Sequence, residues 1–127
     1  MFFAQVALQM GWDHVEPTIP GRPYDCMICT TPEAESAHRH VWEKVQVKRA
    51  YPKAGTGALT VNMTRSGSGE KYAEDDADWL AAVDVLTQQV WLIPWTFVVK
   101  KGRPAVFKKT RITVTEEYSK FILEVPA

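Results

Sequence analysis

The segment 41–50 shows a clear two-residue alternation of side chains, and this alternation constrains the fold more than any other feature. Successive side chains of a β-strand point to opposite faces, so a two-residue period predicts a strand. One face of this strand would carry Val41, Glu43, Val45 and Val47, and the other would carry Trp42, Lys44, Gln46 and Lys48. Val45 and Val47 are expected to pack on one side, and Trp42 and Lys44 are candidates to line a groove on the other.

Short apolar segments separated by Gly, Pro and polar residues predict further strands around this one. The chain is therefore expected to have an α/β fold, with a mixed, twisted central sheet and a flanking N-terminal helix. Its 127 residues are enough for one domain, 1–127. Strands are expected at 12–16, 24–30, 41–50, 58–64, 79–86, 89–94, 96–99, 105–108 and 111–114, and helices at 2–10 and 116–123.

The charges of the chain cancel overall but are unevenly distributed. There are 15 basic and 15 acidic residues, so net charge alone does not indicate a polyanionic partner. The segment 95–115 nevertheless has no acid and is rich in Lys and Arg, and a one-sided basic stripe can bind a polyanion on a neutral protein. The basic residues of this stripe are Lys100, Lys101, Arg103, Lys108, Lys109 and Arg111.

The two cysteines, Cys26 and Cys29, form a Cys-X-X-Cys pair that permits two interpretations. A zinc or redox site is one, and His38 and His40 could supply the two further ligands that zinc needs. The favoured interpretation is a pair of buried free thiols, because a strand at 24–30 sends the two side chains to opposite faces. The N-terminus shows no secretion signal, and no apolar run approaches about twenty residues. A cytoplasmic protein without a membrane segment is expected.

Asp25 at the start of one predicted strand, and Gln46-Val47-Lys48 on the next, form the strongest candidate site. Gln46 and Lys48 are two residues apart, so both point to one side. A carboxylate binds a hard divalent cation, a second oxygen ligand completes its shell, and a lysine can steer a water toward a phosphodiester. The alternative is structural: Asp25 caps a turn and the Lys48 face is simply solvated.

The order of these segments resembles that of the PD-(D/E)xK nuclease superfamily. The order is Gly11-Trp12, then Pro23-Tyr24-Asp25, then Gln46-Val47-Lys48, then Asp78-Trp79-Leu80-Ala81-Ala82-Val83, then Val90-Trp91-Leu92-Ile93-Pro94. The chain is most similar to the small branch that includes homing endonucleases of group I introns, and more distantly to Holliday-junction resolvases. The resemblance covers a core at 2–95 and leaves a β-rich C-terminal extension at 96–127.

The resemblance implies a DNA endonuclease that uses Mg²⁺ or Mn²⁺ to hydrolyse phosphodiester bonds. It places the main metal ligand on Asp25, the second acid position on Gln46, a backbone carbonyl ligand on Val47 and the catalytic lysine on Lys48. Family members often carry a further glutamate on the first helix, which here has no acid; Glu16, on the following strand, is expected to be a poor substitute. Two alternatives stay open: a resolvase of branched DNA, and a nuclease-fold protein that binds a nucleic acid or a protein without cutting.

DNA contacts are expected from basic and polar residues outside the catalytic triplet. The basic stripe is joined by Lys44, Arg49 and Arg65, and Asn62, Thr64 and Ser66 are further polar candidates. If the stripe is only a solvated surface, the DNA path is expected over the face of Trp42 and Lys44. Cleavage of both strands of a duplex needs two sites, so a homodimer or higher oligomer is expected.

Overall fold

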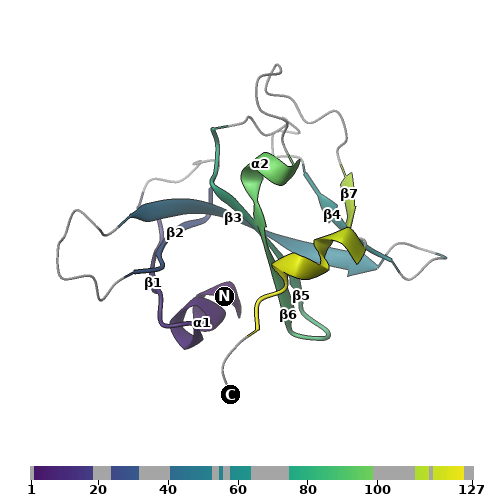
Figure 1. The fold of residues 1–127 in the computed structure, drawn as a ribbon, viewed down its shortest axis with the longest axis horizontal. Helices are drawn as coiled ribbons and strands as arrows, with labels where there is room; N and C mark the ends of the chain where they lie inside the picture. Colours follow the sequence, from purple (N-terminus) through teal and green to yellow (C-terminus); the bar gives the residue numbers. More distant parts are fainter. Residues whose placement is uncertain are drawn as a thin grey trace.

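The structure is a computed structural model of the chain, and it describes residues 2–18, 24–31, 41–52, 55, 58–63, 75–98, 111–114 and 116–124. Figure 1 shows how its elements are arranged in space. The strands are β1 (Asp13–Val15), β2 (Cys26–Cys29), β3 (Trp42–Pro52), β4 (Leu59–Asn62), β5 (Trp79–Asp84), β6 (Gln89–Pro94) and β7 (Arg111–Val114). The helices are α1 (Phe2–Gln9), α2 (Trp95–Val98) and the 3-10 helix η2 (Glu116–Phe121).

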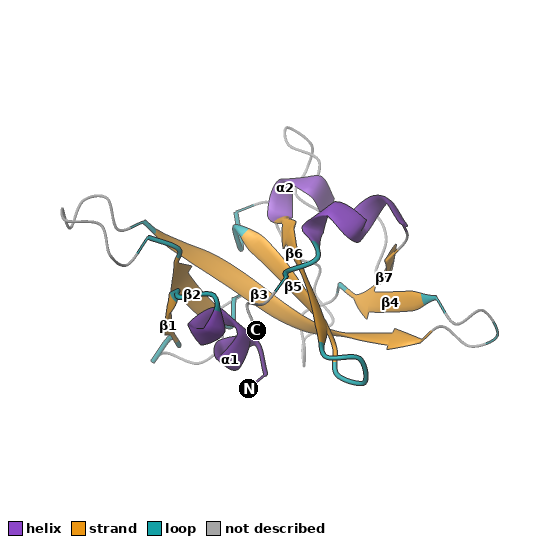
Figure 2. Cartoon of the chain, turned by 60° about the horizontal axis from the view of Figure 1, so that its bottom comes forward, coloured by secondary structure: helices purple, strands orange, loops and turns teal. Residues whose placement is uncertain are grey.

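The long strand β3 organises a mixed sheet of seven strands, and the other strands pair along different parts of it (Figure 2). Its first residues pair with β2 antiparallel, and β2 in turn pairs with β1. Its middle pairs with β5 in parallel, and β6 returns antiparallel beside β5. Its last residues, from Ala50 on, pair with β4, and β4 pairs with β7. The expected α/β fold with a mixed central sheet and an N-terminal helix is confirmed.

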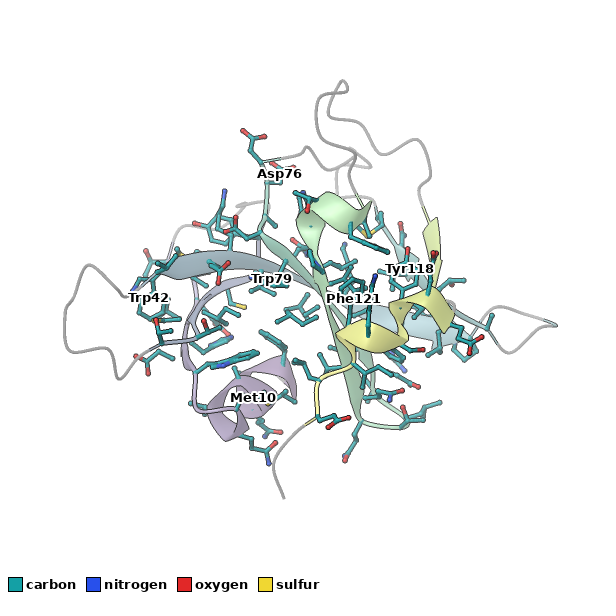
Figure 3. All side chains as sticks on the ribbon, viewed as in Figure 1. Met10, Trp42, Asp76, Trp79, Tyr118 and Phe121 are labelled. Carbon is teal, nitrogen blue, oxygen red and sulfur yellow. The ribbon has the colours of Figure 1, made fainter. Side chains whose placement is uncertain are left out.

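Apolar side chains pack on both faces of the sheet and form two layers. On one side Val45 packs with Ile28 of β2 and with Phe3 and Val6 of α1. On the other side the apolar residues of β4, β5 and β6 pack under α2 and η2, where Trp95 and Tyr118 are buried. Figure 3 shows Met10 by α1 and Tyr118 and Phe121 on η2, on the two sides of the sheet. The sheet is therefore held between α1 and the pair α2 and η2.

Helix α1 ends where the sequence predicts. Gly11 adopts a φ of 80°, the left-handed conformation that glycine tolerates best, and the backbone N–H of Trp12 donates to Ala7 O at 2.9 Å. Phe3, Val6 and Ala7 are buried, whereas the side chains on the other face of the helix are exposed. The helix therefore covers the sheet with one apolar stripe.

One expectation for the C-terminal part is wrong, and another is confirmed in part. The strand expected at 96–99 is replaced by α2, because Pro94 cannot donate to a ladder and the buried Trp95 is fixed by its N–H donating to Asp78 O at 2.9 Å. The helix expected at 116–123 is the shorter 3-10 helix η2, after which Leu123 N donates to Val90 O at 2.8 Å. The strand expected at 111–114 is confirmed, and that expected at 105–108 lies outside the described residues.

Both cysteines are buried and free, as predicted from their position on a strand. Burial, together with the nearby charges of Asp25 and Glu16, raises the pKa of the Cys26 thiol to about 12. Cys26 is therefore a neutral core side chain at physiological pH. His38 and His40, the ligands considered for zinc, lie outside the described residues. Among the described helices, none has the length and apolar character required to span a membrane.

Candidate functional site

Strand pairing between β2 and β3 carries Asp25 to the middle of β3. Cys26 is the Cα partner of Val45, and the backbone N–H of Asp25 donates to Val45 O at 2.9 Å. Asp25 thus lies at the point where β2 begins, while β3 continues beyond it as far as Pro52. Its carboxylate is held at an edge of β3 that β2 does not cover.

The carboxylate of Asp25 is fixed by two hydrogen bonds from the Gln46-Val47 segment. Its Oδ2 atom accepts from Gln46 Nε2 and from the backbone N–H of Val47, both at 2.8 Å. Gln46 is only 6% exposed, and its Nε2 also donates to Val47 O at 3.3 Å. Hydrogen bonds to a carboxylate are stronger than neutral ones, so this contact holds the three residues in one arrangement.

Two oxygen atoms of the site converge on the side-chain amide of Gln46. Asp25 Oδ2 and Val47 O both accept from the same Gln46 amide nitrogen. Rotation of this amide by half a turn would replace the nitrogen with its oxygen. Three oxygens could then face one point, which is the donor set that a hard divalent cation prefers.

The electrostatics of the site couple Asp25 to Lys48. Desolvation by the surrounding protein raises the pKa of Asp25, the hydrogen bond from Val47 and the charge of Lys48 lower it, and the charge of Glu16 raises it. Burial lowers the pKa of Lys48, while the charge of Asp25 opposes that change. Each charge therefore stabilises the other in a partly desolvated position, a combination common at functional sites.

Glu16, expected from the sequence to be a poor substitute for a glutamate on the first helix, comes directly after β1. Val15, the last residue of β1, is the Cα partner of Met27 in this antiparallel pair, so Glu16 continues the chain toward the Cys26 and Asp25 end of β2. Its charge raises the pKa of both Asp25 and Cys26. The available signal was the pair of predicted strands at 12–16 and 24–30, which a proline-containing turn could join as neighbours. The pairing supplies a second carboxylate near Asp25 that α1 does not provide.

Glu43, the acid closest in sequence to Gln46, does not belong to this group. Its Oε2 atom accepts from Trp79 Nε1 at 3.0 Å, and its position on β3 has the opposite parity to Gln46. This agrees with the alternation predicted for 41–50. Glu43 ties β3 to β5 instead.

The structure describes three of the basic residues expected to contact DNA, and each occupies a different setting. Lys44 Nζ donates to Asp75 O at 2.7 Å, and its backbone N–H donates to Asp78 Oδ2 at 2.8 Å. The Arg49 guanidinium lies 4.9 Å from the centre of the Tyr51 ring. Arg111 begins β7, where it is the Cα partner of Asn62. The remaining candidates lie outside the described residues: Arg65, Lys100, Lys101, Arg103, Lys108 and Lys109.

With this geometry established, the fold can be compared with known proteins. The chain has an α/β nuclease-like fold, similar to that of a protein whose structure has been solved. That protein is the bacterial homing endonuclease I-Ssp6803I, with a TM-score of 0.66, 20% sequence identity, and coverage of 91% of this chain and 72% of the other. Neither a protein-family model nor a curated protein sequence matches the chain. At this identity the similarity shows the fold.

Proposed function

We propose that the protein is a divalent-metal-dependent DNA endonuclease of the PD-(D/E)xK type. The observation that carries the proposal is the meeting of Gln46 Nε2, Val47 N and Asp25 Oδ2 at 2.8 Å, with Lys48 coupled to the same carboxylate. The similarity of the fold to a homing endonuclease supports it. Asp25, Gln46 and Lys48 are the proposed catalytic residues.

The residues present fit a Mg²⁺ or Mn²⁺ ion. The Asp25 carboxylate, the Val47 carbonyl and the Gln46 amide oxygen would hold it, and all are the oxygen ligands that hard cations select. Asp25 Oδ2 and Val47 O already converge on a single amide nitrogen, as they would on a cation. Glu16 would add a second negative charge close by. When bound, the ion would polarise the phosphate and stabilise the negative charge that develops during hydrolysis.

The side chains of the site would divide the remaining work. The hydrogen bond from the Val47 N–H, which does not depend on the orientation of the Gln46 amide, fixes the direction of the Asp25 carboxylate before any substrate arrives. Such fixed polar groups act without reorganisation at the moment of reaction. The Lys48 ammonium, whose pKa burial lowers, would orient the attacking water and balance charge at the phosphate. Desolvation of Lys48 makes its Nζ proton easier to release.

One observation favours a second candidate, a nuclease-fold protein that binds DNA without cutting it. Gln46 occupies the position where the resemblance places an acid, so the site has one negative charge fewer. The discriminating assay is incubation of the purified protein with Mg²⁺ on plasmid, linear and four-way-junction DNA. Nicking or linearisation supports the endonuclease, and preference for the junction identifies a resolvase. Binding of all three without any cleavage would establish the second candidate.

We further propose that the active form is a homodimer or a higher homo-oligomer. One catalytic centre per chain cuts one strand, so symmetric cleavage of a duplex requires two chains. Sedimentation of the protein with and without a duplex measures this. A monomer on DNA that still makes double-strand breaks at one encounter would contradict it.

The substitution Gln46→Glu is expected to tighten Mg²⁺ binding by about 10-fold and to keep or increase cleavage, because the affinity of such sites rises with ligand charge. Without metal, two neighbouring carboxylates repel, so the variant should also be less thermally stable and should recover when Mg²⁺ is added. Calorimetric titration and thermal unfolding with and without Mg²⁺ measure both effects.

The matched control adds the same charge at Gln9→Glu, on the exposed end of α1. This variant is expected to bind Mg²⁺ like the wild type. A folded Gln46→Glu protein with no activity would indicate that the hydrogen bond donated by the Gln46 amide is itself required.

The substitution Glu16→Gln has two separable expected effects. Loss of a nearby negative charge should weaken Mg²⁺ binding at neutral pH roughly 3- to 10-fold. Because the charge of Glu16 raises the pKa of Asp25, its removal should lower that pKa. Asp25 must be deprotonated to bind metal, so the pH at which binding is half lost should fall.

Metal titrations over a pH series measure both effects of Glu16→Gln, and Asp13→Asn, an exposed acid of β1, is the control. An unchanged affinity and an unchanged acid limb would show that Glu16 is not part of the site.

A further inference from the structure

The last residues of β3 form, with β4, a sheet face that the catalytic site does not use. Tyr51 is the Cα partner of Thr60, and Ala50 is that of Val61. Ala50, Val61 and Met63 are buried in the apolar layer under α2 and η2. The alternate positions therefore point away from this layer. We call this surface the outer face; its residues are Arg49, Tyr51, Thr60 and Asn62.

The outer face combines an exposed aromatic ring with a stacked cation. Tyr51 is 51% exposed, and the Arg49 guanidinium lies 4.9 Å from the centre of its ring. Arg49 and Asn62 are exposed, and Thr60 donates from Oγ1 to Tyr51 O at 3.3 Å. The polar face of an antiparallel sheet is often merely solvated. An arginine that stacks on an aromatic ring is, however, also used by proteins to recognise nucleic acids.

Charge also distinguishes the outer face from the other end of β3. No acid is present among its four residues, whereas Lys44 at the other end is bonded to the segment that carries Asp75 and Asp78. Acids beside Lys44 would repel a polyanion and disfavour a DNA path over that end. By backbone register, Arg111 and Thr113 of β7 are the Cα partners of Asn62 and Thr60. A polyanion is therefore favoured at the β4 end of the sheet.

The outer face adjoins the proposed catalytic site along β3. Arg49 directly follows Lys48, and Tyr51 is two residues further, which is about 10 Å from Lys48 at about 3.4 Å per residue. The N–H of Val47 points along the sheet to Asp25 Oδ2, so the carboxylate is held at the edge of β3 and not on one face. A duplex seated at this edge can therefore present a phosphate to Asp25 and touch both sides of the strand.

We propose that the outer face lies in the major groove of the DNA duplex and contacts base edges beside the cleaved phosphodiester. This inference rests on the proposed endonuclease function, which determines where the cleaved phosphodiester lies relative to the outer face. A β-ribbon fits the major groove, where Arg pairs with guanine and Asn with adenine. We assign these contacts to Arg49 and Asn62. The Tyr51 ring, over which the Arg49 guanidinium lies, would hold that guanidinium in position.

The test measures binding to a pool of duplexes with a randomised central segment, in Ca²⁺, followed by sequencing of the bound fraction. The proteins are the wild type, Arg49→Gln, Arg49→Lys, Asn62→Ala and the charge-matched control Lys120→Gln. Lys120 is exposed on η2, on the other side of the sheet, where its Nζ atom lies 5.1 Å from the centre of the Phe97 ring. Thermal unfolding of each protein checks the fold, and Mg²⁺-dependent cleavage by the wild type is assayed in parallel.

Arg49→Gln is expected to weaken binding about 10-fold, and Asn62→Ala to remove the preference at one base-pair position. Arg49→Lys should recover affinity but not base preference, because it keeps the charge without the two-pronged donor. Lys120→Gln should match the wild type. The inference is overturned if folded Arg49→Gln and Asn62→Ala keep the affinity and the base preference of the wild type. It is also overturned if these variants lose affinity but keep the wild-type base preference.

Cleavage by the wild type separates the two proposals. If the wild type cuts DNA and the outer-face variants bind normally, only this inference fails. If the wild type does not cut but the variants lose base preference, only the endonuclease proposal fails. A wild type that neither cuts nor binds DNA overturns both.

Discussion

The substitution Asp25→Ala is expected to lower the rate of Mg²⁺-dependent DNA cleavage by roughly 1,000-fold or more. Asp25 is the one acid that both accepts from Gln46 and Val47 and is coupled to Lys48. Without its carboxylate, the remaining ligands would be neutral oxygens, and these hold Mg²⁺ poorly. The measurement is a single-turnover cleavage assay at saturating DNA over a range of Mg²⁺ concentrations.

The fold should survive the loss of this charge. Because burial raises the pKa of Asp25, the folded state binds a proton more readily than the unfolded state does. The contribution of this group to stability therefore decreases as pH rises from the ordinary aspartate range through its folded pKa. Asp25→Asn keeps an acceptor for the Val47 N–H. Its free energy of unfolding at neutral pH should equal that of the wild type or exceed it by at most about 1 kcal/mol.

The control for Asp25 is Asp13→Ala, which removes an exposed acid from β1 near the far end of the β1–β2 pair. Its cleavage rate is expected to match that of the wild type. A well-folded Asp25→Ala protein that cleaves at the wild-type rate would remove Asp25 from the site, and with it the assignment of Gln46 and Val47.

The alternation in 41–50 was enough to predict which residues of β3 share a face. It placed Gln46 and Lys48 on one side and Val45 on the other, because the side-chain period of a strand depends on local geometry alone. Alternation does not determine which strand is the neighbour of β3 or in what register. The approach of Asp25 to Gln46 depends on that long-range pairing, and the resemblance to a nuclease family supplied it in advance.

The features that escaped prediction also depend on long-range contacts. The burial of Gln46 arises because Asp25 accepts from it and β5 pairs beside it, with Leu80 as its Cα partner. The effect of the Glu16 charge on the pKa of Asp25 depends on the way β1 pairs with β2. The strand expected after Pro94 gave way to α2, because burial of Trp95 outweighed local strand propensity.

The substitution Lys48→Met is expected to lower the saturating cleavage rate at least about 100-fold, the usual size of a lost acid–base or charge-balancing group. Methionine keeps an unbranched apolar stem and removes the ammonium. The variant should still bind Mg²⁺, but the pH dependence of this binding should change. The charge of Lys48 lowers the pKa of Asp25, so its removal raises that pKa, and Mg²⁺ binding should be half lost at a higher pH than in the wild type.

Lys44→Met is the matched control, since Lys44 lies on the same strand and by parity on the same face, and its Nζ atom is engaged with Asp75 O. Its saturating rate is expected to stay near the wild-type value even if it binds DNA more weakly. A wild-type saturating rate for Lys48→Met would exclude Lys48 from the chemistry.

The variant Lys48→Arg separates the two functions that a lysine can serve at this position. A guanidinium keeps the positive charge, so the pKa of Asp25 and the pH dependence of Mg²⁺ binding should resemble those of the wild type. It does not release a proton in proteins, however, and its planar fork cannot replace a compact ammonium. Recovery of the cleavage rate with Arg would show that Lys48 acts only by its charge. Recovery of metal binding without the rate, the outcome we expect, would show that the desolvated Nζ atom positions the attacking water or handles its proton.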